Sequence, residues 1–558
     1  MSRRLLSGAL GLVLLAGCGG GQAPADAPSA SSGQVAAPAQ AARVSYYAAA
    51  RFAEQVSFGP TPALIADIQA KGYERWIDEQ LALPLAPMST TVAQEIYRYG
   101  NNVQVPNRII SQFDLEMMRM ALTVPDQLRL RVMWSLAHFI VAGRSKGEVP
   151  GWIEWANMLY RQSLGRYGDL LREVSLNPHM AHYLDNDQNR PKSAECQHCA
   201  PNENYARELM QLFSIGVFKL NADGTPQRDA RGRYIETYTQ RDVEELARVL
   251  TGWEHDPNPP SRPQRNWGNW AKRMTPTTWP PMRDGGRKVV LGKEFPAGQT
   301  QAKDLDDAIA LLMAHPNTAP FVSLRLIQHL VKSDPTPAYV GRVAAVFLNN
   351  GRTGAVGDLS AVVKAVLLDP EARRGDNPAT ANNADGKFRE PYLHRMATMR
   401  GMGCQRALSR GEDWYYSVWL QPALNPESVF GFYAPTDTAP GSNLLAPEQR
   451  LINSAELTTR LGELNWNRWD PSRQVNDLAL YTAAGCDAQA FADAYASSPR
   501  AFLDLLSLRY FRGAMPPTLR STIEQLIRNP QWNVNDPTEG PMRMLAYALS
   551  TPSFGVIK

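Results

Sequence analysis

Apolar residues recur at helical spacing along most of the chain after residue 44. Behind Asp126, a candidate N-cap that follows Pro125, the steps are mostly three and four residues, through Leu130, Met133, Trp134, Ala137 and Val141. Thr61 and Pro62 predict a helix that starts with proline in its first turn. The same spacing predicts helices near 152–165, 202–215, 240–251, 302–314, 319–332, 337–349, 358–368, 448–463, 488–495 and 518–528. We therefore expect a mainly α, multi-helical globular body over residues 44–558, as one mass or as two packed lobes.

Two stretches interrupt this helical pattern. The segment from Val217 to Tyr238 holds two turn dipeptides, Asp223-Gly224 and Arg231-Gly232, between apolar and aromatic residues, which predicts a small β-hairpin. The segment 256–292 is rich in tryptophan and proline and predicts a long loop. Its tryptophans are candidates for binding a glycan or a partner chain through flat aromatic faces; they are Trp267, Trp270 and Trp279.

The first 43 residues have the pattern of an export signal and a tether. Arg3 and Arg4 precede a short apolar run that ends in Leu15-Ala16-Gly17-Cys18, which resembles a bacterial lipobox. Residues 1–18 are therefore predicted to be a lipoprotein signal peptide, with lipidation at Cys18. Residues 19–43 are nearly all Gly, Ala, Pro, Ser and Gln, a composition typical of a flexible tether. Gly19 after the anchor favours sorting to the outer membrane, with the body facing the periplasm.

The amino-acid composition limits the classes of molecule that this protein is expected to bind. Of the 558 residues, 44% are hydrophobic and 20% are charged, which is ordinary for a globular protein. Lys and Arg number 58 against 54 Asp and Glu, so the formal net charge of +4 gives no basic field suited to nucleic acid. The sequence has no nucleophile elbow, phosphate loop or His-Glu-x-x-His motif, and no cofactor is expected.

Several motifs together resemble a bacterial family called domain of unknown function 1800. They are Arg51-Phe52, Ser57-Phe58-Gly59-Pro60-Thr61, Tyr183-Leu184-Asp185-Asn186, Pro201-Asn202-Glu203-Asn204-Tyr205-Ala206-Arg207-Glu208-Leu209, Asp242-Val243, Ala247-Arg248-Val249-Leu250-Thr251-Gly252-Trp253, His315-Pro316-Asn317-Thr318-Ala319-Pro320-Phe321 and Ala446-Pro447-Glu448. The resemblance implies an exported, mainly helical protein. It also implies a secreted sulfatase-like protein as a partner, but no established activity or catalytic residue.

The Asn-Glu-Asn-Tyr-Ala-Arg-Glu motif contains most of the candidate catalytic residues. On a helix from residue 202, Glu203 and Arg207 lie four residues apart and are predicted to form an ion pair. Glu203 and Glu208 point in different directions, so a pair of facing carboxylates would need a second group, with Asp185 as the first candidate. Glu203, Arg207, Glu208 and Asp185 are therefore candidate catalytic residues. The alternative is a structural network that ties helices together.

Cysteines and histidines suggest two further possibilities. Apart from Cys18 the chain has four cysteines, and in an exported protein an even number favours disulfides, although four thiols allow three pairings. We expect Cys196 and Cys199 to be oxidised. The alternative is a metal site in which these two thiolates join His179 and His182, a ligand set that zinc accepts. His138 and His329 lie in apolar helices and are interpreted as core residues.

Two functions remain open at this stage. The first is a binding or assembly role in the cell envelope, towards a glycan or a partner protein. The second is hydrolysis of an envelope polymer by the carboxylates and arginine of the motif helix. We favour binding, because the sequence shows no complete catalytic constellation.

Overall fold

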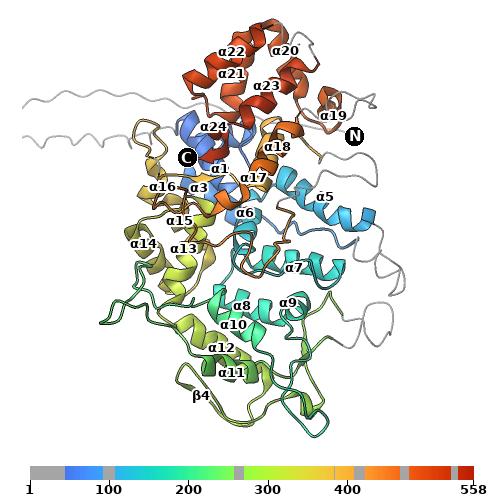
Figure 1. The fold of residues 1–558 in the computed structure, drawn as a ribbon, viewed down its shortest axis with the longest axis vertical. Coiled ribbons are helices and arrows are strands. Elements are labelled where there is room, and N and C mark those ends of the chain that lie inside the picture. Colours follow the sequence, from blue (N-terminus) through green and yellow to red (C-terminus); the bar gives the residue numbers. More distant parts are fainter. Residues whose placement is uncertain are drawn as a thin grey trace, which may run out of the picture. The chain divides into compact units, whose positions relative to one another are not determined.

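The computed structural model describes residues 44–91, 107–256, 269–382, 384–406, 421–464, 477–529 and 538–558. Helices dominate these residues, which confirms the predicted mainly α fold (Figure 1). The first group of helices is α1 (Tyr46–Val56), α2 (Pro62–Lys71), α3 (Tyr73–Leu81), α5 (Asn107–Thr123), α6 (Gln127–Leu136), α7 (Val149–Gln162), α8 (Tyr167–Leu176), α9 (Pro178–Tyr183), α10 (Glu203–Gln211) and α11 (Gln240–Val249).

The second half of the chain continues in the same way. Its helices are α12 (Gln301–Ala314), α13 (Thr318–Leu330), α14 (Pro337–Leu348), α15 (Leu359–Leu368), α16 (Pro370–Arg374), α17 (Pro391–Gly401), the 3₁₀ turn η2 (Pro447–Leu451), α18 (Ser454–Glu463), α19 (Asp477–Ala483), α20 (Ala488–Ser497), α21 (Pro499–Tyr510), α22 (Pro517–Arg528), α23 (Gly540–Leu549) and α24 (Pro552–Gly555). Helices α20 to α23 pack on one another as a group (Figure 1).

Local capping chemistry explains where several helices begin. The Thr61 hydroxyl accepts a hydrogen bond from the Leu64 backbone N–H at 3.1 Å, and proline opens α2 as predicted. Thr239 and Asp242 form a reciprocal capping box at the start of α11. Asp126 precedes α6 but makes no capping bond, because its carboxylate accepts the Tyr160 hydroxyl instead.

Two helices, α6 and α17, are buried on every side. All ten residues of α6 and all eleven residues of α17 are buried. Each helix nonetheless carries charged groups, which must find partners inside the protein. Arg400 of α17, for example, donates to the backbone carbonyls of Gly59, Ala121 and Leu122. The core is therefore apolar packing crossed by buried polar connections.

The two non-helical stretches are more structured than the sequence indicated. Residues 217–238 form an arm held by single bridged pairs, such as Phe218 with Glu236 and Arg228 with Tyr234, in place of a regular hairpin. The segment predicted as one long loop contributes short paired strands. They are β1 (Trp253–Glu254) with β2 (Thr275–Pro276), and β3 (Lys288–Val290) with β4 (Lys293–Phe295), with the 3₁₀ turn η1 (Pro280–Met282) between them.

A third antiparallel pair joins distant parts of the chain. Strand β5 (Lys387–Phe388) pairs with β6 (Val556–Ile557), so the end of the chain lies against the approach to α17. None of the helices in the described ranges is long and apolar enough to cross a membrane.

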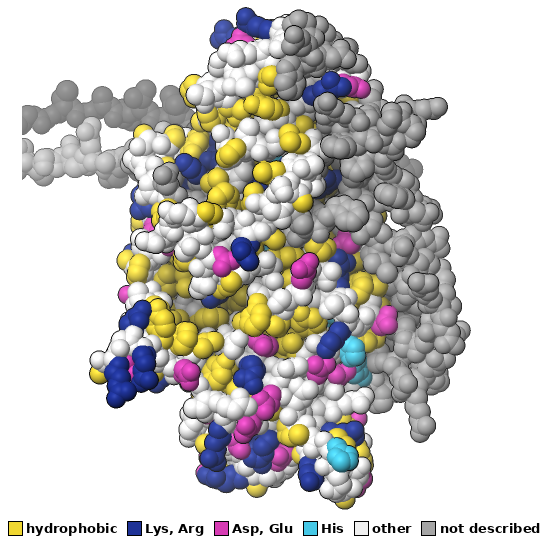
Figure 2. Space-filling view, viewed as in Figure 1, with side chains coloured by type: hydrophobic (Ala, Val, Ile, Leu, Met, Phe, Trp, Pro, Cys, Tyr) yellow, Lys and Arg dark blue, Asp and Glu magenta, His cyan; other side chains and the backbone are white. Residues whose placement is uncertain are grey.

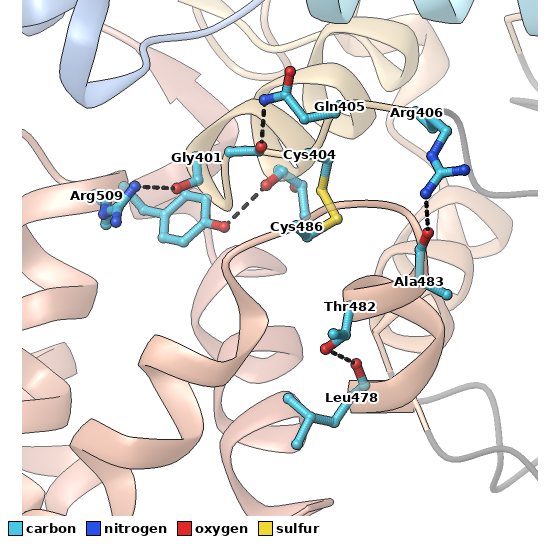
Figure 3. Close-up of a disulfide and its surroundings, with 12 residues drawn as sticks. Gly401, Cys404, Gln405, Arg406, Leu478, Thr482, Ala483, Cys486 and Arg509 are labelled. Atoms are coloured by element: carbon cyan, nitrogen blue, oxygen red, sulfur yellow. Dashed lines mark hydrogen bonds between the residues drawn. A yellow bond between two sulfur atoms is a disulfide. The ribbon is translucent and has the colours of Figure 1, made fainter.

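A disulfide between Cys404 and Cys486 connects the end of α17 to the turn after α19 (Figure 3). Hydrogen bonds accompany it on both sides. Arg406 donates to the Ala483 carbonyl, and Arg509 of α21 donates to the Gly401 carbonyl. The C-terminal helices are thus attached covalently to the buried centre of the body.

Candidate functional site

A pocket of about 380 Å³ lies where α10 ends, beside α13, the 217–226 arm and the segment 429–436. Its size falls in the range of roughly 300–1,000 Å³ typical of small-molecule sites. The walls are mostly apolar and aromatic, and include Phe139, Leu212, Phe218, Phe321 and Phe432. Figure 2 shows hydrophobic side chains gathered around a hollow near the middle of the viewed face. The motif helix therefore contributes its last turn to a pocket.

Six polar side chains interrupt the apolar lining, namely His138, Gln211, Arg325, His329, Tyr433 and Thr436. Arg325 donates to the Gln328 side chain at 2.8 Å and lies over the Phe321 ring, with 5.1 Å from the guanidinium carbon to the ring centroid. Burial lowers the pKa of Arg325 to about 10. Among the described residues no carboxylate lies within ion-pair distance of Arg325, so its charge lines the pocket without a counter-charge.

A buried polar network continues behind the pocket. Glu390 is the residue before α17, and its Oε2 lies 2.9 Å from Nε2 of the His138 ring. Lys387 lies 3.1 Å from the other oxygen of Glu390 and 3.2 Å from Glu448. The Tyr433 hydroxyl donates to Glu390 at 3.0 Å. Segments around residues 138, 387–390 and 433 therefore meet at one carboxylate.

Burial and neighbouring charges together set the ionisation of this network. Burial would raise the pKa of Glu390, but Lys387 and His138 outweigh it and hold that pKa well below its usual range. Burial raises the pKa of Glu448, with Lys387 opposing the rise. Burial, assisted by the charge of His138, lowers the pKa of His329 well below its usual value. The network thus holds a firmly ionised Glu390 beside a neutral His329.

The motif helix presents its predicted ion pair at the surface. Arg207 Nη2 lies 2.8 Å from Glu203 Oε2, and each side chain is 36% exposed. Gln240 of α11 also donates to Glu203 at 2.8 Å and accepts from Arg207 at 3.2 Å. These contacts join α10 to α11 and have the geometry expected of a structural network.

Asp185 and Glu208 occupy different surroundings. Asp185 pairs with Lys146 at 2.7 Å and accepts from the Asn204 side chain at 2.9 Å, so Asn204 contacts Asp185 and not Glu208. Glu208 is buried, and its Oε2 has no hydrogen-bond partner. Burial raises the pKa of Glu208 to about 7, against the charge of Arg207. Burial thus alters the ionisation of Glu208 strongly.

The predicted aromatic faces are only partly available. Trp270 is buried between the rings of His182 and His255, at centroid distances of 5.5 and 5.1 Å, and presents no face to a ligand. The reason is that the 269–282 segment folds back onto α9. Trp279 is 41% exposed, and Trp267 lies outside the described residues.

The structure does not bring the four predicted metal ligands together. Cys196 and Cys199 are joined by a disulfide, so neither offers a thiolate. His182 Nδ1 lies 2.8 Å from Asp187, and His179 is buried beside Trp155. Burial lowers the pKa of His179 to about 3. The remaining cysteines, Cys404 and Cys486, form the second disulfide.

Sequence reasoning missed the pocket and its network. Their helices predict His138 and His329 to be core residues, and both are buried, but both also line the pocket. One signal was present. Arg129 and Arg131 alternate with leucines in α6, and charges inside an apolar helix imply buried partners. Arg131 donates to the His329 carbonyl at 2.8 Å.

The family described as "Protein of unknown function (DUF1800)" has a model that matches residues 51–556. Neither the curated proteins nor the solved structures include a match to the chain. The match extends over most of the sequence and includes the motif helix, the pocket walls and the buried network. The chain therefore belongs to the DUF1800 family of proteins of unknown function.

Proposed function

We propose that this protein is a lipid-anchored binding protein of the cell envelope whose pocket takes an amphiphilic anion. The unpaired charge of Arg325 carries this proposal. A guanidinium that lines an apolar pocket without a carboxylate loses hydration, and an anionic ligand would restore the lost interaction through a charge-assisted hydrogen bond. The ligand's hydrocarbon part would contact the aromatic walls.

The export signal and the disulfides support the proposed location in the cell envelope. The lipobox-like sequence before Cys18 and the 19–43 tether would place the body beside a membrane. The two disulfides of the structure belong to the chemistry of an oxidising compartment such as the periplasm. Mass spectrometry of the mature N-terminus tests the anchor, and an unmodified terminus downstream of Cys18 would contradict it.

Binding of decanoate tests the pocket. Decanoate combines a hydrocarbon chain with a carboxylate, and decanol of equal chain length supplies the neutral comparison. Calorimetric titration of the mature protein should show decanoate binding more tightly than decanol. Arg325→Met should weaken decanoate binding by roughly tenfold or more, because a charge-assisted hydrogen bond is lost.

The exposed Arg352 provides a matched control, and Arg352→Met should leave decanoate binding unchanged. The proposal is wrong if decanoate does not bind, or if it binds equally to the Arg325→Met protein.

A hydrolase role has one specific observation in its favour. A buried carboxyl whose pKa is about 7 has the ionisation that a general acid needs near neutral pH, and Glu208 has this property. Digestion of purified peptidoglycan by the mature protein, analysed by chromatography, tests this second function. Fragments released by the wild type but not by Glu208→Gln would support it, and an unchanged polymer would exclude this substrate.

A further inference from the structure

Three side chains at the inner end of the pocket have the arrangement of a metal site. His138 and His329 line the pocket and Glu390 lies behind them, and we call this place the pocket floor. His138 follows α6, His329 lies in α13, and Glu390 precedes α17. One ligand atom from each lies within 4.8 Å of the others, and all three residues are buried. No other trio of His, Cys, Asp or Glu in the described ranges meets this criterion. Two imidazoles and one carboxylate are a ligand set found for zinc and for iron(II).

The hydrogen bonds of His138 leave one ring nitrogen facing the carboxylate. Nδ1 lies 2.8 Å from the Trp134 carbonyl oxygen, which can only accept, so Nδ1 carries the hydrogen. In a neutral imidazole Nε2 is then a lone pair, and it lies 2.9 Å from Glu390 Oε2. The Gln421 amide nitrogen lies 3.2 Å from this Nε2 and 2.6 Å from Glu390 Oε2, so it can donate to both acceptors. A cation on Nε2, either a second proton or a metal ion, would add an attraction between the two groups that the amide alone does not supply.

The groups around these residues resemble the outer shell of a metal site. The carbonyl that fixes the His138 tautomer is one of the usual partners of a metal-bound histidine. Gln421 holds Glu390 Oε2 at 2.6 Å, while Tyr433 and Lys387 hold the other oxygen. The carboxylate is thus oriented from several sides before any ion binds.

Charge balance and access are also compatible with a cation. The two buried carboxylates next to the site, Glu390 and Glu448, equal in number the buried cations Lys387 and Arg131, and Arg325 is a further positive charge on the pocket wall. His138 and His329 line the pocket. An ion can therefore enter through the pocket, and its remaining coordination position would face the ligand space.

We propose that His138, His329 and Glu390 bind one divalent transition-metal ion at the floor of the pocket. The remaining position would accept an anionic group from the pocket side. This site goes beyond the proposed binding function and does not depend on it, since the metal is measured without organic ligand and decanoate binding is measured on metal-free protein.

Titration with Zn²⁺ and Co²⁺ tests the site. The mature protein is stripped with a chelator, titrated, and analysed for bound metal after desalting. We expect one equivalent of either ion, and a visible absorption band of Co²⁺ at low coordination number. The spectrum of the wild type needs no substitution, so the test stands even if a variant fails to fold.

His329→Ala and Glu390→Gln should each weaken Zn²⁺ binding by about a hundredfold, as expected when a protein ligand is removed from a three-ligand site. His198→Ala is the matched control, because His198 is exposed in the turn closed by Cys196 and Cys199, and it should bind Zn²⁺ as the wild type does. A wild type that binds no metal overturns the proposal. So does equal binding by folded His329→Ala and Glu390→Gln proteins.

Discussion

The motif helix and the pocket floor use the same kinds of residue in opposite surroundings. On α10, Glu203 and Arg207 form an ion pair that is 36% exposed on each side. At the pocket floor, Lys387 and Glu390 form an ion pair whose side chains are at most 1% exposed. The N–O distances are 2.8 and 3.1 Å, but water screens the first pair and is largely excluded from the second, so similar distances correspond to very different energies. The most distinctive sequence motif is therefore not where the strongest electrostatics lie.

Removing the buried cation should give the largest effect. Lys387→Met leaves Glu390 and Glu448 inside the protein without their shared ammonium group, and we expect the free energy of unfolding to fall by roughly 3–5 kcal/mol. Guanidinium denaturation measures this. Adding Glu448→Gln should recover part of the loss, because that substitution removes one uncompensated carboxylate. A loss below about 1 kcal/mol for Lys387→Met would show that the pocket floor is as well screened as the surface.

Replacing Glu208 should change the free energy of unfolding by an intermediate amount that depends on pH. Its pKa in the folded protein is raised from 4.5 to about 7, so between these values the folded state holds a proton that the unfolded state has released. The contribution to stability is therefore present below about pH 4.5 and is lost as pH rises through 7. Glu208→Gln should exceed the wild type by less than about 1 kcal/mol at pH 5 and by roughly 2 kcal/mol at pH 8, after allowance for partial solvation.

Glu244→Gln on α11 is the comparison for Glu208, because Glu244 is exposed. Urea denaturation of both variants at the two pH values separates burial from the simple loss of a negative charge. The same stability difference at pH 5 and pH 8 for Glu208→Gln would contradict the assigned pKa.

Breaking the exposed ion pair between Glu203 and Arg207 should have the smallest effect on stability. A double-mutant cycle with Glu203→Ala and Arg207→Ala should measure a coupling of roughly 0.3–0.5 kcal/mol, the range of a surface pair spaced four residues apart on a helix. Thermal unfolding in low and high salt provides the check, since salt should reduce the coupling further. A coupling above about 2 kcal/mol would remove the contrast between the two regions.

Much of the fold could be predicted because its signals are local. Apolar spacing located α12 to α15, and Thr61 with Pro62 marked the start of α2. Helix α17 is not among the predicted helices, and its burial on all sides leaves it no polar face to alternate with an apolar one. Helix α6 is buried to the same extent, but Pro125 and Asp126 mark its start in the sequence. The positions of α12 to α15 were thus easier to predict than the complete burial of α17.

The candidate site could not be predicted because its contacts are non-local. His138 and Glu390 are 252 residues apart, and neither belongs to a spaced motif. Asp126 shows the same effect over a shorter separation. Tyr160, 34 residues away, donates its hydroxyl to the carboxylate predicted to cap the helix. By contrast, the Glu203–Arg207 pair follows from helical spacing alone.

The disulfide between Cys404 and Cys486 changes what a broken backbone would mean for this protein. A protease that cuts the chain once between these residues produces two fragments that stay joined through sulfur. Helices α20 to α23 would then remain attached to α17, with the contacts of Arg509 intact. Chain cleavage and release of the C-terminal helices are therefore separate events, and the second requires a reductant.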